Sequence, residues 1–233
     1  MFQNFDLNQL VIKIATLLFA VTIHEVAHGY VAYRMGDNTA LLAGRLTLNP
    51  IKHLDLVGSF LMPAMLLLFS SPFIFGYAKP VPVNFGRLRD YRKGTIYVSS
   101  AGVLANLGFA IICGILFRIM LGLELFQYNN FLRPFITELF LLLGYSVMIN
   151  IVLAVFNMLP VPPLDGSRVL AMFLPIHLRQ QFARLERFGI IIIMFLLVSN
   201  SLSSLFAFIP QIMGLLLGSD GLRLFLVLIG AFQ

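Results

Sequence analysis

Two histidines and a glutamate within one short stretch are the strongest chemical signal in this sequence. His24, Glu25 and His28 form the pattern H-E-x-x-H. Side chains four residues apart lie on one face of a helix, so both imidazoles can reach a single metal ion. The glutamate beside the first histidine is then placed to take a proton from a water that the metal activates. The pattern therefore predicts a metal site with its own general base.

The element that must position these groups is itself apolar. They lie within residues 10–35, a stretch long enough to cross a bilayer. Ionisable side chains inside a membrane are costly, so they are a functional hypothesis by default. The alternative is a pair of hydrogen-bonded helix histidines with an acid nearby, and hydrocarbon offers few partners for such a pair.

Composition places the whole chain in the membrane. Of its 233 residues, 59% are hydrophobic and 11% are charged, and the mean hydropathy is +0.92. These values indicate an integral membrane protein rather than a soluble globule. The net charge of +6 then concerns orientation and anionic lipid, and no nucleic-acid partner is expected. The lone cysteine, Cys113, excludes a disulfide framework and a cysteine metal site.

We expect an all-α polytopic fold with five to six transmembrane helices, a re-entrant or hairpin segment, and short β-strands near the active site. One membrane-embedded domain is expected over residues 1–233, with a catalytic core over about 7–170 and C-terminal helices over about 175–233. The N-terminus lacks a basic region and a small-residue cleavage site, so the first helix is expected to remain as an anchor. The expected segments are spans at 7–34, 95–121 and 134–159, a re-entrant element at 56–77, strands within 39–48, an extended edge at 78–89, an interfacial helix at 175–187, and further apolar segments from about 188.

A catalytic zinc site needs a third protein ligand. The candidates are Asp165, Asp55, His53, His177 and Glu138. Asp165 is the best of them because it follows a run of prolines that ends or distorts a helix, and a broken helix at membrane depth is tolerated where it lines a cavity. Glycine follows it and gives the backbone freedom. His53 and Asp55 could instead bind a second metal or form hydrogen bonds within their loop.

At this point the sequence resembles the site-2 protease family of intramembrane metalloproteases. The resemblance rests on His24-Glu25-x-x-His28 together with a later motif, Asn157-x-x-Pro160-x-Pro162-x-Leu164-Asp165-Gly166. Residues 101–106 resemble the family's G-P-x-x-N motif, with Val103 in place of the proline. Residues 45–55 (RLTLNPIKHLD) and 75–89 (FGYAKPVPVNFGRLR) resemble a compact bacterial and archaeal branch, in which a proline often stands where this chain has Leu56.

The resemblance implies a role for each matching residue. His24, His28 and Asp165 would bind one zinc ion, and Glu25 would act first as general base and later as acid. Asn157 and Asn106 would line the cleft and orient the substrate or stabilise the oxyanion. From the residues alone, the alternative for Asn157 is a helix-end cap, and the alternative for Asn106 is an interhelical hydrogen bond.

The expected function is zinc-dependent hydrolysis of peptide bonds in or near the transmembrane segments of membrane proteins. A helical substrate hides its peptide bonds, so it must be unwound before attack. Extended stretches that contain Leu46 and Val83 could hold the substrate by strand addition, although an ordinary structural hairpin is the alternative. The competing functions are a transporter or channel whose buried ionisable groups relay ions, and a catalytically silent membrane scaffold.

Orientation follows from the need for the motifs to meet at one depth. The first and fourth apolar segments must run in one direction and the third in the other, which works if residues 56–77 re-enter the membrane. One side then holds 12 of the 16 Lys and Arg residues, and the positive-inside rule makes that side cytoplasmic. We therefore expect a prokaryotic plasma membrane, an N-terminus outside and an active site toward the cytoplasm.

Overall fold

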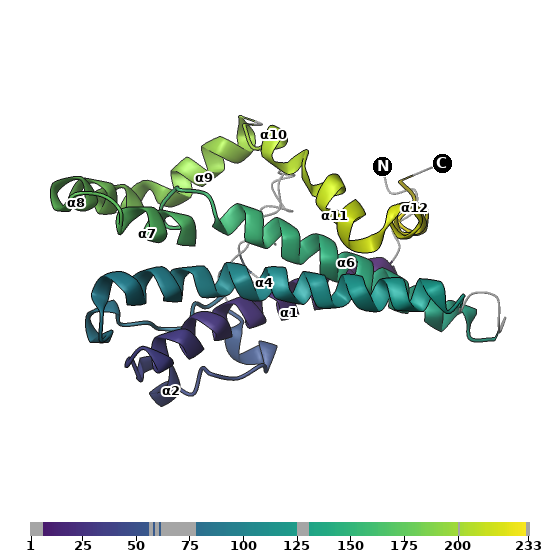
Figure 1. The fold of residues 1–233 in the computed structure, drawn as a ribbon, viewed down its shortest axis with the longest axis horizontal. Helices are drawn as coiled ribbons and strands as arrows, with labels where there is room; N and C mark the ends of the chain where they lie inside the picture. Colours follow the sequence, from purple (N-terminus) through teal and green to yellow (C-terminus); the bar gives the residue numbers. More distant parts are fainter. Residues whose placement is uncertain are drawn as a thin grey trace. The chain divides into compact units, whose positions relative to one another are not determined.

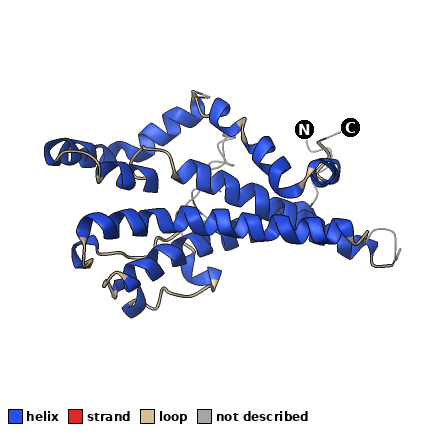
Figure 2. Cartoon of the chain, in the orientation of Figure 1, coloured by secondary structure: helices blue, strands red, loops and turns tan. Residues whose placement is uncertain are grey.

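The computed structural model describes residues 7–55, 58, 61, 78–124, 131–199 and 201–231. Every regular element in these residues is a helix (Figure 2). The elements are α1 (Leu7–Arg34), α2 (Thr39–Leu42), η1 (Pro50–His53), η3 (Phe85–Arg87), α4 (Tyr91–Gly122), α6 (Arg133–Asn157), α7 (Asp165–Ala171), α8 (Ile176–Arg184), η4 (Leu185–Phe188), α9 (Gly189–Val198), α10 (Ser203–Phe206), α11 (Ile209–Leu217) and α12 (Ser219–Leu228).

Three long helices, α1, α4 and α6, are apolar enough to cross a membrane, and they lie where the sequence predicts its first spans. The helices α11 and α12 are bent by 114° at a short break and raise the count to four if they form one span. The predicted five to six transmembrane helices are therefore not reached in the described residues. Apart from Gly58 and Leu61, the predicted re-entrant element at 56–77 lies outside those residues.

The prediction of short β-strands is wrong for the described part of the chain. Between residues 39 and 48, the helical turn α2 replaces the expected strand. The carboxylate of Asp37 accepts hydrogen bonds from the backbone N–H and the hydroxyl of Thr39, and this side-chain bonding favours a turn over a strand. Gly44, with a φ of +63°, ends the turn.

The segment of residues 79–84 contains no strand either. Prolines 80 and 82 have no N–H, so the segment cannot form a full ladder with a neighbour. Its remaining polar groups bond mainly to side chains, as described below. The alternating prolines, which predict an extended edge, belong to a segment that lies along α1 through Val81.

The described residues form two compact units, Val21–Gly102 in one and Met1–Ala20 with Val103–Gln233 in the other. The first unit holds the C-terminal part of α1, the loops that follow it and the start of α4. Its small core contains Ala32, Leu88 and Val98, packed with Val31, Met35, Val83 and Phe85.

The second unit is built around α6, which contacts both α11 and α12 (Figure 1). Small residues allow close packing there: a Cβ on Gly144 would overlap the ring of Phe225. That ring packs edge-on against Tyr145, with ring centroids 5.2 Å apart. The hydroxyl of Tyr145 in turn donates to Gln9 on the N-terminal part of α1.

Candidate metal centre

The two histidines of the H-E-x-x-H pattern face each other on α1. The Nε2 atoms of His24 and His28 are 3.0 Å apart, and the side chains are 7% and 9% exposed. The Nδ1 atom of His28 lies 2.7 Å from the carbonyl oxygen of Val98 on α4. Because a carbonyl only accepts, Nδ1 carries the proton and Nε2 keeps its lone pair. A backbone carbonyl that fixes the tautomer in this way is typical of metal-binding histidines.

The spacing of the two nitrogens fits a shared zinc ion. Two imidazole nitrogens bound tetrahedrally at 2.0–2.1 Å from one zinc lie about 3.3 Å apart. The Nε2 atoms of His24 and His28 lie at nearly that separation, and both side chains are buried. The pair therefore fits zinc by donor type and separation, and His28 also fits by its tautomer.

A glycine on α4 makes room for both imidazoles. A Cβ on Gly102 would lie 2.5 Å from Cε1 of His24 and 2.6 Å from Nε2 of His28. Carbon contacts are normally about 3.5–4.0 Å, so no larger residue fits without moving the rings. Gly102 therefore sets how closely α4 approaches the histidine face of α1.

Glu25, the predicted general base, has one carboxylate oxygen bound to the backbone. Its Oε2 accepts a hydrogen bond of 2.7 Å from the N–H of Val81. The side chain is half-buried, and Oε1 accepts no hydrogen bond from the described residues. One oxygen is therefore held while the other remains available for proton transfer.

The predicted third ligand belongs to the second unit. Asp165 is the first residue of α7, eight residues after α6 ends at Asn157. A Cβ on Gly166 would overlap the carbonyl group of Met158 and lie 2.7 Å from the carbonyl oxygen of Leu159. The role expected for Gly166 thus needs correction, because it provides close approach rather than unusual backbone freedom. Asp165 as the third zinc ligand stays a prediction.

The two predicted cleft asparagines differ in their surroundings within this second unit. The side-chain amide of Asn157 donates to the carbonyl of Leu153, 3.0 Å away on the preceding turn of α6. Asn106 on α4 is fully buried, and neither of its side-chain polar atoms has a hydrogen-bond partner among the described residues. Asn157 is thus tied to its own helix end, whereas the interhelical bond considered for Asn106 is not formed there.

The alternative metal candidates near η1 are engaged in local hydrogen bonds. The Nε2 atom of His53 lies 2.9 Å from the carbonyl oxygen of Thr47, and the carboxylate of Asp55 accepts from the N–H of Gly58. These contacts favour hydrogen bonding within the loop for both residues over a second metal site. The other two candidates lie elsewhere in the chain: Glu138 on α6 and His177 on α8.

The residues predicted to bind substrate pack against the protein itself. Leu46 is half-buried, and its Cδ2 atom would lie 2.7 Å from a Cβ on Gly29 of α1. Val83 packs against the core of Ala32, Leu88 and Val98. Contact with substrate would therefore have to come from their backbone rather than their side chains.

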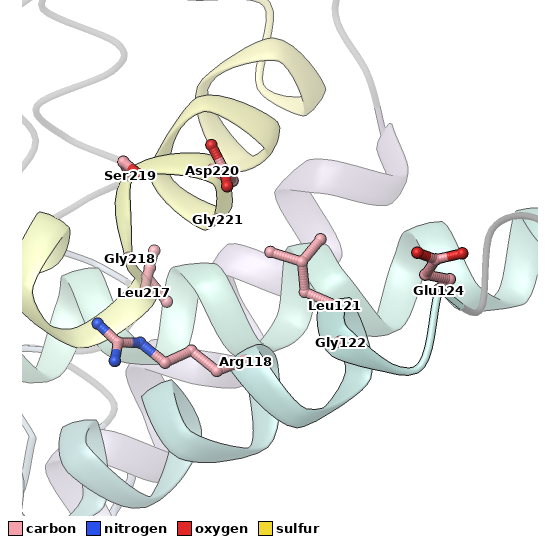
Figure 3. Close-up of a pocket in the computed structure, with 9 residues that line it drawn as sticks. All are labelled: Arg118, Leu121, Gly122, Glu124, Leu217, Gly218, Ser219, Asp220 and Gly221. Carbon is pink, nitrogen blue, oxygen red and sulfur yellow. The ribbon is translucent and has the colours of Figure 1, made fainter.

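A pocket in the second unit lies between the end of α4 and the junction of α11 and α12 (Figure 3). Arg118 at its edge donates to the carbonyl of Leu215 at 2.6 Å, which ties α11 to α4. None of the predicted site residues lines this pocket. Its lining is Arg118, Leu121, Gly122, Glu124, Leu217, Gly218, Ser219, Asp220 and Gly221.

Sequence reasoning missed three residues that shape the surroundings of the histidine pair and Glu25. Val98 and Val81 bind His28 and Glu25 through backbone atoms, and no pattern of side chains in the sequence predicts such contacts. Gly102 did carry a signal, because it stands in the six-residue stretch that resembles a family motif. The motif directs attention to its asparagine, not to the space that the glycine leaves for the histidines.

Comparison with known proteins gives a consistent result. The sequence model of peptidase family M50 matches residues 12–199. The chain is 38% identical over 200 residues to a Bacillus subtilis protein named "Putative zinc metalloprotease YwhC", covering 85% of each chain. It is 26% identical over 196 residues to "Putative zinc metalloprotease Rip2" of Mycolicibacterium smegmatis, covering 84% of this chain and 70% of the relative. No solved structure matches.

The family match covers most of the chain, including the histidine pair, Glu25 and the Asp165 motif. It also removes the two competing functions, since neither a transporter nor a silent scaffold explains a general base beside two paired histidines, one of which, His28, has the tautomer that suits a metal. With its apolar helices, this membrane protein is thus a member of peptidase family M50, the site-2 protease family, and a zinc-dependent metalloendopeptidase.

Proposed function

We propose that this enzyme hydrolyses peptide bonds in or near the transmembrane segments of membrane proteins. The observation that carries the proposal is the location of the histidine pair and Glu25 on α1, a helix long and apolar enough to cross a membrane. A protease for soluble substrates gains nothing from burying such groups in a membrane helix, where they are costly. A substrate that arrives through the bilayer explains their placement.

The proposed zinc ligands are His24, His28 and Asp165. When bound, zinc supplies Lewis acidity, which activates a water near neutral pH and polarises the scissile carbonyl. His28 supports this role through the Nδ1 proton that it donates to Val98. For Asp165, the support is its oxygen donor type and its position at the start of α7, which the small Gly166 packs closely against the end of α6.

Glu25 is the proposed proton carrier. Its Oε1 takes the proton of the attacking water and later gives a proton to the leaving amine. The oxyanion that forms needs a donor, and Asn106 is a buried side chain whose amide is not engaged by the described residues. Asn157 would line the cleft beside it.

The substrate is proposed to bind in an extended form, after local unwinding, along the segment of residues 79–84. Val83 has the one N–H of this segment that no described residue accepts, so it can pair with a substrate carbonyl. Leu46 would flank this path through its backbone. Cleavage of a helical substrate that survives Val83→Pro unchanged would remove this part of the proposal.

The protein is proposed to lie in a prokaryotic plasma membrane, with its active site toward the cytoplasmic side. Asp37 accepts a hydrogen bond of 2.6 Å from the N–H of Asn84, so the loops that follow α1 and precede α4 share one end of their unit. Those loops carry many of the basic residues that the positive-inside rule assigns to the cytoplasm. The variants Asn38→Cys and Asn84→Cys, each in a Cys113→Ala background, should react with an impermeant reagent from the cytoplasmic side. Labelling of either from outside would contradict this orientation.

Cleavage in liposomes tests the central part of the proposal. Purified protein is reconstituted with a peptide that carries one cleavage sequence within a transmembrane helix, and the same sequence is offered as a soluble peptide. We expect the wild type to cut the transmembrane peptide and Glu25→Gln to lose at least about 100-fold in rate, the lower bound for a general base. Cleavage of the soluble peptide alone would contradict an intramembrane function.

A further inference from the structure

Most backbone N–H groups in the segment of residues 79–84 are missing or engaged, and one of the engaged groups is bound to the general base. Prolines 80 and 82 have no N–H. The N–H of Lys79 donates to the carbonyl of His53 at 2.9 Å, and that of Val81 donates to Oε2 of Glu25 at 2.7 Å. The contact with Glu25 is therefore one of several fixed bonds along the segment rather than an isolated encounter.

Asp37 holds the C-terminal end of this segment. Its carboxylate is fully buried, and its Oδ2 accepts from the N–H of Asn84 while its Oδ1 accepts from Thr39. Burial by itself would raise the pKa of Asp37, but these hydrogen bonds and the charge of Arg87 together lower that pKa. The acceptor is thus a carboxylate at neutral pH, and its bonds to the backbone N–H groups are charge-assisted.

Arg45 holds the other end. This arginine is 8% exposed, and its Nη2 donates to the carbonyl of Lys79 at 2.7 Å and reaches that of Pro80 at 3.5 Å. Between the two anchors, the side chain of Val81 packs on α1, where its Cγ1 would lie 2.7 Å from a Cβ on Gly29. The glycine lets the segment lie directly on the turn of α1 that follows Glu25.

We propose that the segment of residues 79–84 is a positioning element for the general base: the backbone N–H of Val81, fixed by Asp37 and Arg45, orients the carboxylate of Glu25 for proton transfer. The inference rests on the proposed role of Glu25 and deepens it. A free glutamate side chain samples many rotamers, and a bond to one oxygen reduces that freedom. It leaves Oε1 aimed for the reaction, in line with the need to hold catalytic groups by supporting contacts.

A pair of substitutions at position 81 tests the proposal. Val81→Pro deletes the N–H in a backbone that flanking prolines already restrict to extended conformations. Val81→Ala keeps the N–H and measures the cost of the lost packing on Gly29. We expect Val81→Pro to lower kcat about tenfold more than Val81→Ala does, the scale of one charge-assisted hydrogen bond, with KM and zinc content alike in both.

Other kinetic results would overturn the proposal in distinguishable ways. A kcat that rises in Val81→Pro would mean that the N–H masks Glu25 rather than positions it. A change in KM alone would mean that the segment only binds substrate, and equal losses in both variants would mean that packing is responsible. Full activity of Glu25→Gln in the same series would be a failure of the proposed function itself.

Hydrogen exchange supplies a readout that needs no cleavage. In the metal-free protein we expect the amide of Val81 to exchange faster in Glu25→Ala, which removes its acceptor, and in Asp37→Ala, which releases the segment. Glu138→Ala, which removes a carboxylate on α6, is the matched control and should leave the exchange rate at wild-type level. An unchanged rate in Glu25→Ala would overturn the inferred contact.

Discussion

Substituting Gly102 with alanine should damage the metal centre although the residue has no chemistry of its own. The new Cβ would lie 2.5–2.6 Å from atoms of His24 and His28. An ordinary carbon contact needs about 3.5 Å, so the rings must move by about 1 Å or the helices α1 and α4 must separate. Zinc sites tolerate ligand errors of only about 0.2 Å. We therefore expect Gly102→Ala to lose most of its bound zinc.

The size of the effect separates this explanation from general destabilisation. Overpacking of this kind costs about 1–3 kcal/mol in stability, which leaves many proteins folded. The matched control is Gly108→Ala on the same helix, where the new Cβ would meet no atom of the described residues within 4 Å beyond its own stretch of helix. Helix propensity favours alanine there, so the control should keep its zinc and melt at the same or a higher temperature.

The assay is zinc content after dialysis against a weak chelator, with thermal melting in detergent as the check on folding. Gly102→Ala should melt as a folded protein and retain far less zinc than Gly108→Ala. Wild-type zinc retention by Gly102→Ala would refute the reasoning, because it would show that the histidine face does not depend on the close approach of α4.

Three further predictions concern Gly166, Glu25 and Asp37. Gly166→Ala places a Cβ against the carbonyl of Met158, so we expect α7 to shift and both zinc content and cleavage to fall; retention of both would contradict the role given to that glycine. Glu25→Gln should keep its zinc while cleavage falls at least about 100-fold, and loss of the metal instead would assign Glu25 to the ligand set. Asp37 has a lowered pKa, so in the range where the unfolded state binds the extra proton, stability rises with pH. Its contribution is complete above the ordinary aspartate value of about 3.9 and is lost as pH falls through the lower folded value; the melting-temperature gap between wild type and Asp37→Asn should therefore be constant from pH 7 to about 5 and close in stronger acid. A gap that widens in acid would reverse the sign of this argument.

The long helices could be predicted because apolar length and stop signals act locally. The first predicted span ends before Met35, Gly36 and Asp37, and α1 ends at Arg34 with a φ of +107° at Gly36. The histidine pair could also be predicted from the sequence, since a spacing of four residues on a helix places both side chains on one face.

The prediction of strands in the loops is wrong because their structure depends on hydrogen bonds between carboxylate side chains and the backbone. Alternation between residues 39 and 48 suggested strands, but the carboxylate of Asp37 binds Thr39 and starts a helical turn. The pattern around Val81 predicts an extended edge. In the structure, the N–H of Val81 instead donates to Glu25 on α1, and the N–H of Asn84 donates to Asp37, which follows α1. The partners of Val81 and Asn84 are 56 and 47 residues away in sequence, and no periodicity encodes such contacts.

Zinc content, measured by mass spectrometry on detergent-purified protein, tests the central claim most directly. Three proteins are compared: the wild type, Asp165→Ala, and Glu138→Ala as a control that removes another acid in the same unit. The proposed ligand set predicts about one zinc per chain in the wild type and in Glu138→Ala, and little or none in Asp165→Ala. Full zinc occupancy in Asp165→Ala, with wild-type affinity, would contradict the proposal that His24, His28 and Asp165 together hold the catalytic metal.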